Sequence, residues 1–228
     1  MSVSEYAAIY MATAARTYGQ AVLSAGPVLD VDTADAAVAL GQRLMRQVFG
    51  AGGPPPGALA NLITRVEDAT FPAELEDVVQ EALARDPDLE AAVGHALADF
   101  YRQQIVAGNT RAMVRLGDLL RSQDDVEGAR AAFQRAIDFG QRDVAPEARV
   151  ELGYLLMLSQ RDYQGAQAAF EQAINSRHAE WAPAAMVALA RVLEKQGDRA
   201  GARAAFQQAV DTGNADWAPY ARGELQNL

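Results

Sequence analysis

Apolar side chains recur at helical spacing along most of the chain. In the first half, five segments carry apolar residues three and four positions apart, as one buried face of an α-helix requires. They predict helices over residues 4–24, from a cap at Asp32 or Thr33 to residue 49, and over residues 58–67, 72–85 and 87–106. Pro72 and Pro87 fit the first helical turn, which needs no N–H group from them. We therefore expect a five-helix unit in residues 1–107.

The first of these helices carries Tyr6, Ile9 and Tyr10 on one side and many alanines elsewhere. We interpret this side as packing inside the N-terminal unit. The alternative is a helix used for self-association or for lying on a membrane surface. A membrane-surface helix favours a polar face rich in Lys and Arg, and here only Arg16 is present, so we expect no membrane insertion.

The segment Gly50–Gly57 interrupts the helical pattern with four glycines and three prolines. Glycine-rich loops also hold phosphate groups, but such loops follow a β-strand and end in Gly-Lys-Ser or Gly-Lys-Thr. Neither feature is present in this sequence, so we interpret the segment as a connector.

One nine-residue motif occurs three times in the second half of the chain. A Gly-Ala-x-Ala-Ala-Phe-x-x-Ala run begins at Gly128, Gly165 and Gly201, at intervals of 37 and 36 residues. A period of this length is typical of helical repeat arrays, in which each unit buries its apolar face against its neighbours.

An aspartate stands three residues before each of these glycines, at Asp125, Asp162 and Asp198, where it is placed to cap the second helix of its unit. The second unit has one extra residue between its two helices, and we expect the turn to contain it. Trp181-Ala182-Pro183 and Trp217-Ala218-Pro219 open the next first helix, and we expect both tryptophans to be structural.

These units resemble the tetratricopeptide repeat (TPR) family. Leu116, Gly117, Ala129, Phe133 and Ala136 meet the family pattern in register. The second unit meets it with Leu152, Gly153, Ala166, Phe170 and Ala173, and the third with Ala190 in place of the glycine. Together with the five-helix unit predicted above, the resemblance implies an all-α fold: a five-helix N-terminal domain (residues 1–107) followed by a TPR-like α-solenoid of three helical hairpins and a C-terminal capping helix (residues 108–228).

In this family, ligands lie along the concave groove lined by the first helix of each unit. By register, the resemblance implies that the groove is lined by Arg111, Val114, Asp118, Arg121, Glu147, Val150, Tyr154, Met157, Val187, Arg191, Glu194 and Lys195. Some members hold a carboxylate tail with paired Asn and Lys side chains. Val114, Asp118 and Tyr154 occupy those places here, so that clamp is absent. Arg191 and Lys195, one helical turn apart, favour an acidic segment.

The composition argues against several classes of binding site and catalytic site. The formal net charge is -10, of which residues 1–107 carry -8, and an acidic surface argues against nucleic-acid binding. The chain has no cysteine, and neither His95 nor His178 has a second ligand at a metal spacing. No Gly-x-Ser-x-Gly turn is present. We therefore expect that the protein is not an enzyme and that it binds no metal ion and no cofactor.

The function that we expect is a non-enzymatic adaptor that binds a protein or peptide partner in the TPR groove. The alternative is a self-assembling structural protein that forms a homo-oligomer through its helical domains. The arginine-dominated, alanine-rich composition indicates a bacterial protein, and the absence of cysteine, of a signal peptide and of a membrane span indicates a cytoplasmic one. The N-terminal unit also resembles small helical modules of bacterial signalling and conflict-system proteins, through Leu44–Gly50 and Leu83–Leu89.

Overall fold

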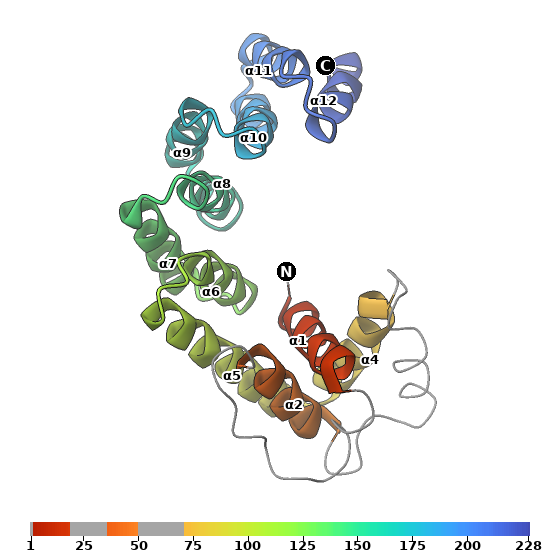
Figure 1. Cartoon of the computed structure of the whole chain (residues 1–228). Helices are drawn as coiled ribbons and strands as arrows, with labels where there is room; N and C mark the ends of the chain where they lie inside the picture. Colours follow the sequence, from red (N-terminus) through yellow and green to blue (C-terminus); the bar gives the residue numbers. More distant parts are fainter. Residues whose placement is uncertain (1, 19–35, 50–70) are drawn as a thin grey trace. The chain divides into compact units, whose positions relative to one another are not determined.

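A computed structural model of the chain describes residues 2–18, 36–49 and 71–228 (Figure 1). All regular elements in these ranges are helical, as expected. The described part divides into two compact units, Met1–Gln103 and Gln104–Leu228. The predicted helix at residues 58–67, the connector Gly50–Gly57 and the caps at Asp32 and Thr33 lie outside the described residues.

The N-terminal unit contains α1 (Val3–Tyr18), α2 (Ala36–Phe49), α4 (Phe71–Arg85) and most of α5 (Pro87–Val106). Helix α1 contacts both α2 and α4, and its residues Ala7 and Ala8 are buried. Two helices begin at or next to the prolines predicted to start them: α5 begins at Pro87, and α4 begins one residue before Pro72.

Aromatic side chains join α1 to α5. The rings of Tyr6 and Tyr101 meet edge to face at 5.7 Å, and those of Tyr10 and Phe100 at 5.0 Å. The predicted apolar side of α1 is narrower than the sequence suggested, because Ile9 is 41% exposed while Tyr6 is buried.

The second unit consists of three helical hairpins and a final helix. The hairpins are α6 (Arg111–Ser122) with α7 (Val126–Phe139), α8 (Ala145–Leu155) with α9 (Tyr163–Asn175), and α10 (Trp181–Lys195) with α11 (Arg199–Asp211), followed by α12 (Trp217–Asn227). Helices α6, α8, α10 and α12 follow one another along one side of this unit, and α7, α9 and α11 along the other (Figure 1). We call the first set the first helices and the second set the second helices.

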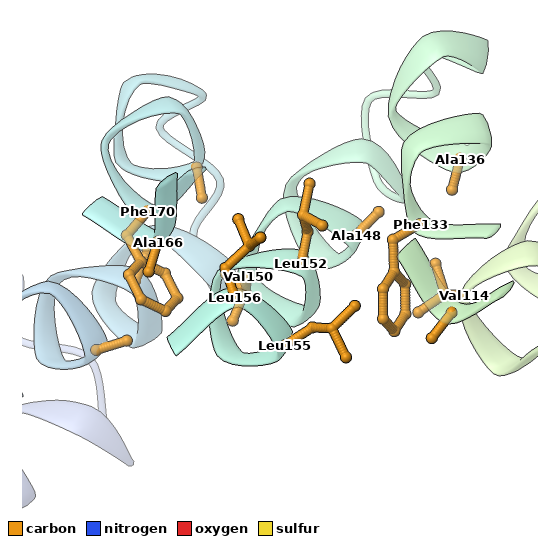
Figure 2. Close-up of a cluster of buried hydrophobic side chains, with 14 of the residues drawn as sticks. Val114, Phe133, Ala136, Ala148, Val150, Leu152, Leu155, Leu156, Ala166 and Phe170 are labelled. Carbon is orange, nitrogen blue, oxygen red and sulfur yellow. The ribbon is translucent and has the colours of Figure 1, made fainter. Parts of the chain in front are cut away.

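Apolar side chains of consecutive hairpins pack into two core clusters, one spanning the first two hairpins and part of α10, the other the third hairpin and α12. Each hairpin has one completely buried phenylalanine, as the repeated motif predicted: Phe133, Phe170 and Phe206. Figure 2 shows Phe133 and Phe170 on either side of α8, whose Leu152 and Leu155 lie between them. Each hairpin therefore buries its apolar face against the next one, which couples the stability of adjacent units.

The predicted helix caps are present in all three hairpins. The carboxylates of Asp125, Asp162 and Asp198 accept a hydrogen bond from the backbone N–H of the glycine three residues later, at 2.8–2.9 Å. Each of these bonds satisfies one N–H group of the first turn that has no partner inside the helix.

The extra residue of the second unit lies in a helix and not in the turn, which corrects the expectation from sequence. The N–H of Asp162 donates to the carbonyl of Leu156, six positions back, whereas Asp125 donates to Leu120 and Asp198 to Leu193, five positions back, each at 2.9 Å. The segment η4 (Leu156–Gln160) is a single π-helical turn at the end of α8. A π-helical turn contains one more residue than an α-helical turn, so the insertion leaves the following turn and cap unchanged.

Trp181 and Trp217 begin α10 and α12, and each packs half-buried against an apolar core, consistent with the structural role expected for both. Ala221 and Leu225 of α12 also pack against the third hairpin.

Candidate functional site

The first helices meet along a row of charged side chains. Helix α6 contacts α8, α8 contacts α10, and α10 contacts α12. Ion pairs join α6 to α8 and α10 to α12, so the residues that form them lie on the side where the first helices face one another. We call this side the first-helix surface.

The α6–α8 part of this surface begins with Glu147 on α8. Its carboxylate lies 3.6 Å from Nε of Arg111 and 3.8 Å from Nη2 of Arg115, both on α6. Neither distance is that of a close hydrogen bond, and Oε2 of Glu147 is buried without a hydrogen-bond partner. Burial raises the pKa of Glu147, and the two guanidinium groups partly oppose this effect.

Asp118 and Arg121 continue the row one turn further along α6. Nη2 of Arg121 is 3.0 Å from Asp118, and Nη1 is 2.7 Å from Oε2 of Glu151 on α8. Arg115 lies 3.7 Å from the other oxygen of Asp118. Burial, followed by the nearby charge of Glu151, raises the pKa of Asp118 to about 6, against the opposing influence of Arg121 and Arg115.

Acidic and basic groups lie at different depths in this network. The side chains of Glu147 and Asp118 are only 5% and 7% exposed, whereas those of Arg111 and Arg115 are 54% and 38% exposed. An approaching molecule therefore meets guanidinium groups first, and the carboxylates that balance their charge lie beneath them.

The α10–α12 part of the surface is built around Arg191. Its Nη2 lies 3.6 Å from Glu224, and its guanidinium group lies 5.4 Å from the centre of the Tyr220 ring. Glu224 comes from the last helix, and its side chain is 31% exposed and faces Arg191.

Tyr154 on α8 connects the two parts. Its ring meets Phe170 edge to face at 5.4 Å. Burial and then the charge of Glu151 raise the pKa of its hydroxyl, while Arg191 lowers it, so this side chain lies within reach of charges from both parts.

The structure distributes the groove residues expected from sequence over three environments. Val114, Val150 and Val187 are buried in the apolar cores, because these positions face neighbouring helices, and they are not accessible to a partner. Met157 is half-buried against the core, and Glu194 and Lys195 are exposed at the end of α10. The charged network or its neighbourhood contains Arg111, Asp118, Arg121, Glu147, Tyr154 and Arg191.

Four residues of this surface were not expected from sequence: Arg115, Glu151, Tyr220 and Glu224. Arg115 and Glu151 each stand four positions after an expected residue, Arg111 and Glu147. Extending the helical spacing by one turn would have found both.

Within the described ranges, no group of three His, Asp or Glu side chains is arranged to hold a metal ion. Among the helices described, none has the length and apolar character needed to cross a bilayer.

Two models described as tetratricopeptide repeat match the chain, one over residues 88–146 and the other over residues 157–224. Together they span more than half of the sequence. The first match begins in α5, one helix before the first complete hairpin. No curated protein matches the chain.

Proposed function

Because the chain belongs to the tetratricopeptide-repeat family, whose repeats generally mediate protein–protein interaction, we propose that it is a non-enzymatic adaptor that binds an acidic segment of a partner protein on the first-helix surface. The observation that carries this proposal is the difference in depth between the guanidinium groups of Arg111 and Arg115 and the carboxylates of Glu147 and Asp118.

Guanidinium groups suit such a role because they offer several N–H donors in a fixed plane. Arg111 and Arg191 are about half-exposed, and their ion pairs are 3.6 Å long, so their guanidinium groups keep N–H donors for direct hydrogen bonds to a partner carboxylate. The buried carboxylates keep the guanidinium groups in place before binding, which reduces the side-chain entropy lost on association.

Aromatic side chains add apolar contact area along the same surface. Tyr154 is half-buried between the two charged parts, and Tyr220 is exposed beside Arg191. Tyrosines of this kind give a peptide contact area at a low entropic cost. An acidic segment that also carries apolar side chains therefore fits this surface best.

The proposal is tested with a fluorescent decapeptide of alternating Glu and Leu, whose binding to the full chain is followed by fluorescence polarisation. The double variant R111Q/R191Q removes two charges from the first-helix surface. We expect it to weaken binding by about tenfold or more and to reduce the dependence of affinity on salt concentration.

The matched control is R135Q/R203Q, which removes two exposed charges from the second helices α7 and α11. We expect it to leave the affinity within about twofold. Equal loss in both double variants would mean that only net charge matters, and an unaffected R111Q/R191Q variant would place the binding site elsewhere.

A further inference from the structure

A polar cavity of about 420 Å³ lies between two consecutive connections of the repeat array, the α7–α8 connection and the α9–α10 connection. Its lining includes Arg142, Asp143, Arg149, Arg177 and His178. Arg149 stands two positions from both Glu147 and Glu151 on α8, and residues two apart point to different sides of a helix. The cavity is therefore separate from the first-helix surface.

The charged groups around this cavity are mostly cationic. Three guanidinium groups line it against a single carboxylate, that of Asp143. Within the part of the chain that the structure describes, Arg142, Arg149 and Arg177 form no ion pair and no side-chain hydrogen bond. Nε of Arg149 is buried and has no acceptor. In a protein with a net charge of -10, this is a local excess of unpaired donors.

His178 contributes a further donor. Its Nδ1 accepts from the backbone N–H groups of Glu180 at 3.3 Å and Trp181 at 3.4 Å, at the start of α10. Because Nδ1 accepts, the neutral ring carries its proton on Nε2. That nitrogen is 3.8 Å from Asp143 Oδ1, too far for a hydrogen bond.

The next pair of connections shows that the repeat does not need these charges. One unit later, the positions of Arg142, Arg149, Arg177 and His178 are occupied by Ala179, Met186, Gly213 and Asn214. There the connections are joined by a neutral hydrogen bond, from Nδ2 of Asn214 to the carbonyl of Ala179 at 3.2 Å. The cationic cluster is thus a property of one place in the array and not of its packing.

Arg177 also occupies an unfavourable backbone conformation. Its φ is 54°, in the left-handed region, whereas the corresponding residues of the neighbouring units are Gly140 with φ 72° and Gly213 with φ 66°. A residue with a Cβ atom is less favourable than glycine in this region. The chain therefore places an arginine beside the cavity where a glycine would be unstrained.

We propose that this cavity binds a phosphoryl group. Guanidinium groups bind phosphate oxygens through paired, charge-assisted hydrogen bonds, and three of them match the charge of a dianion better than that of a single carboxylate. Nε of Arg149 and Nε2–H of His178 are the donors that such a ligand satisfies. The phosphoryl group belongs either to a small molecule or to a phosphorylated side chain of a protein.

The test titrates inorganic phosphate into the full chain at constant ionic strength and follows by NMR the backbone amide signals of the cavity-lining residues 140–143 and 176–179, which are present in every variant. We expect saturable binding with one phosphate per chain. Loss of one charge-assisted hydrogen bond should weaken it about tenfold or more in R149Q and R177G. R177G is expected to stay folded, because glycine relieves the left-handed backbone at this position.

R203Q, which removes an exposed charge on α11, and R191Q, on the first-helix surface, are the controls, and we expect neither to change phosphate affinity. A non-saturating titration, or equal weakening in R177G and R203Q, would overturn the site. A phosphoserine heptapeptide that binds at least about tenfold more tightly than inorganic phosphate would assign the ligand to a protein, and equal affinities would assign it to a small molecule. Because the cavity is separate from the first-helix surface, this outcome does not depend on the acidic-segment proposal.

Discussion

The ring of Phe170 occupies the space that a side chain at Gly153 would need. A Cβ atom built on Gly153 would lie 2.5 Å from Cε1 of Phe170, and the same relationship joins Gly117 to Phe133 at 2.5 Å. The two helices of a hairpin approach so closely because one contributes no side chain where the other contributes a phenyl ring. The third hairpin has Ala190 at this position.

This relationship predicts that G153A destabilises the array. Its added methyl group meets the side of a fully buried ring, and overpacking of this kind costs about 1–3 kcal/mol. The control is G223A on α12, where a Cβ would meet nothing within 4 Å and where alanine favours the helix by about 0.5–1 kcal/mol. Urea unfolding of both variants checks the prediction, and a stabilised G153A would contradict the packing described.

The buried phenylalanines should dominate the stability of the second unit. F170A is expected to cost about 3–5 kcal/mol, the range for emptying a buried aromatic site. The matched control is F139A, at the end of α7, where the ring is 60% exposed and little apolar area is lost. Thermal unfolding compares the two, and similar melting temperatures for F170A and the parent chain would contradict the buried position of Phe170.

The sequence was sufficient for the helical units because their geometry depends on a few residues. Ala129, Phe133 and Ala136, with their copies, place small and large side chains at fixed positions between two close helices, and this pattern is visible in the sequence. The surface was harder to predict. A first helix contacts its own second helix and also neighbouring first helices, so only a narrow strip of it is accessible. Val114 and Val150 fall just outside this strip, and Arg115 and Glu151 fall inside it.

The π-helical turn also could not be predicted from the sequence. A single extra residue can be placed in a turn or in the last turn of a helix, and the spacing from Gly153 to Gly165 is the same in both cases. The turn is constrained by the left-handed residue Arg161 and the cap Asp162, which match Asp124 and Asp125 in the first hairpin. The helix end is less constrained, and it contains the insertion.

Deleting Ser159 should therefore be tolerated. This exposed residue lies in η4, and its loss restores the spacing of the first hairpin without changing Arg161 or Asp162. We expect an unchanged circular dichroism spectrum and an unfolding free energy within about 1 kcal/mol of the parent, as for surface changes. A large loss of stability would show that the π-helical turn is required for packing.

The raised pKa of Asp118 gives the stability a pH dependence. Its pKa is 3.8 when unperturbed and about 6 in the folded chain, so between these values the folded state binds more protons than the unfolded state. The contribution of Asp118 to the unfolding free energy therefore falls as pH rises through this window, by at most about 1.4 kcal/mol per pH unit. In the D118N variant, this decline of the unfolding free energy with rising pH should be absent. Urea unfolding at intervals from pH 4 to 7 tests it, and parallel curves for the two proteins would contradict it.

The claim that the first-helix surface binds a partner is tested most directly by mapping where a ligand lies. The full chain, labelled with ¹⁵N, is titrated with the Glu-Leu decapeptide, and the backbone amide signals are followed by NMR. We expect the signals around Arg111, Tyr154 and Arg191 to shift together and saturate, while those around Arg135 and Arg203 on the second helices stay in place. Shifts confined to the second helices, or to residues before Arg111, would contradict it.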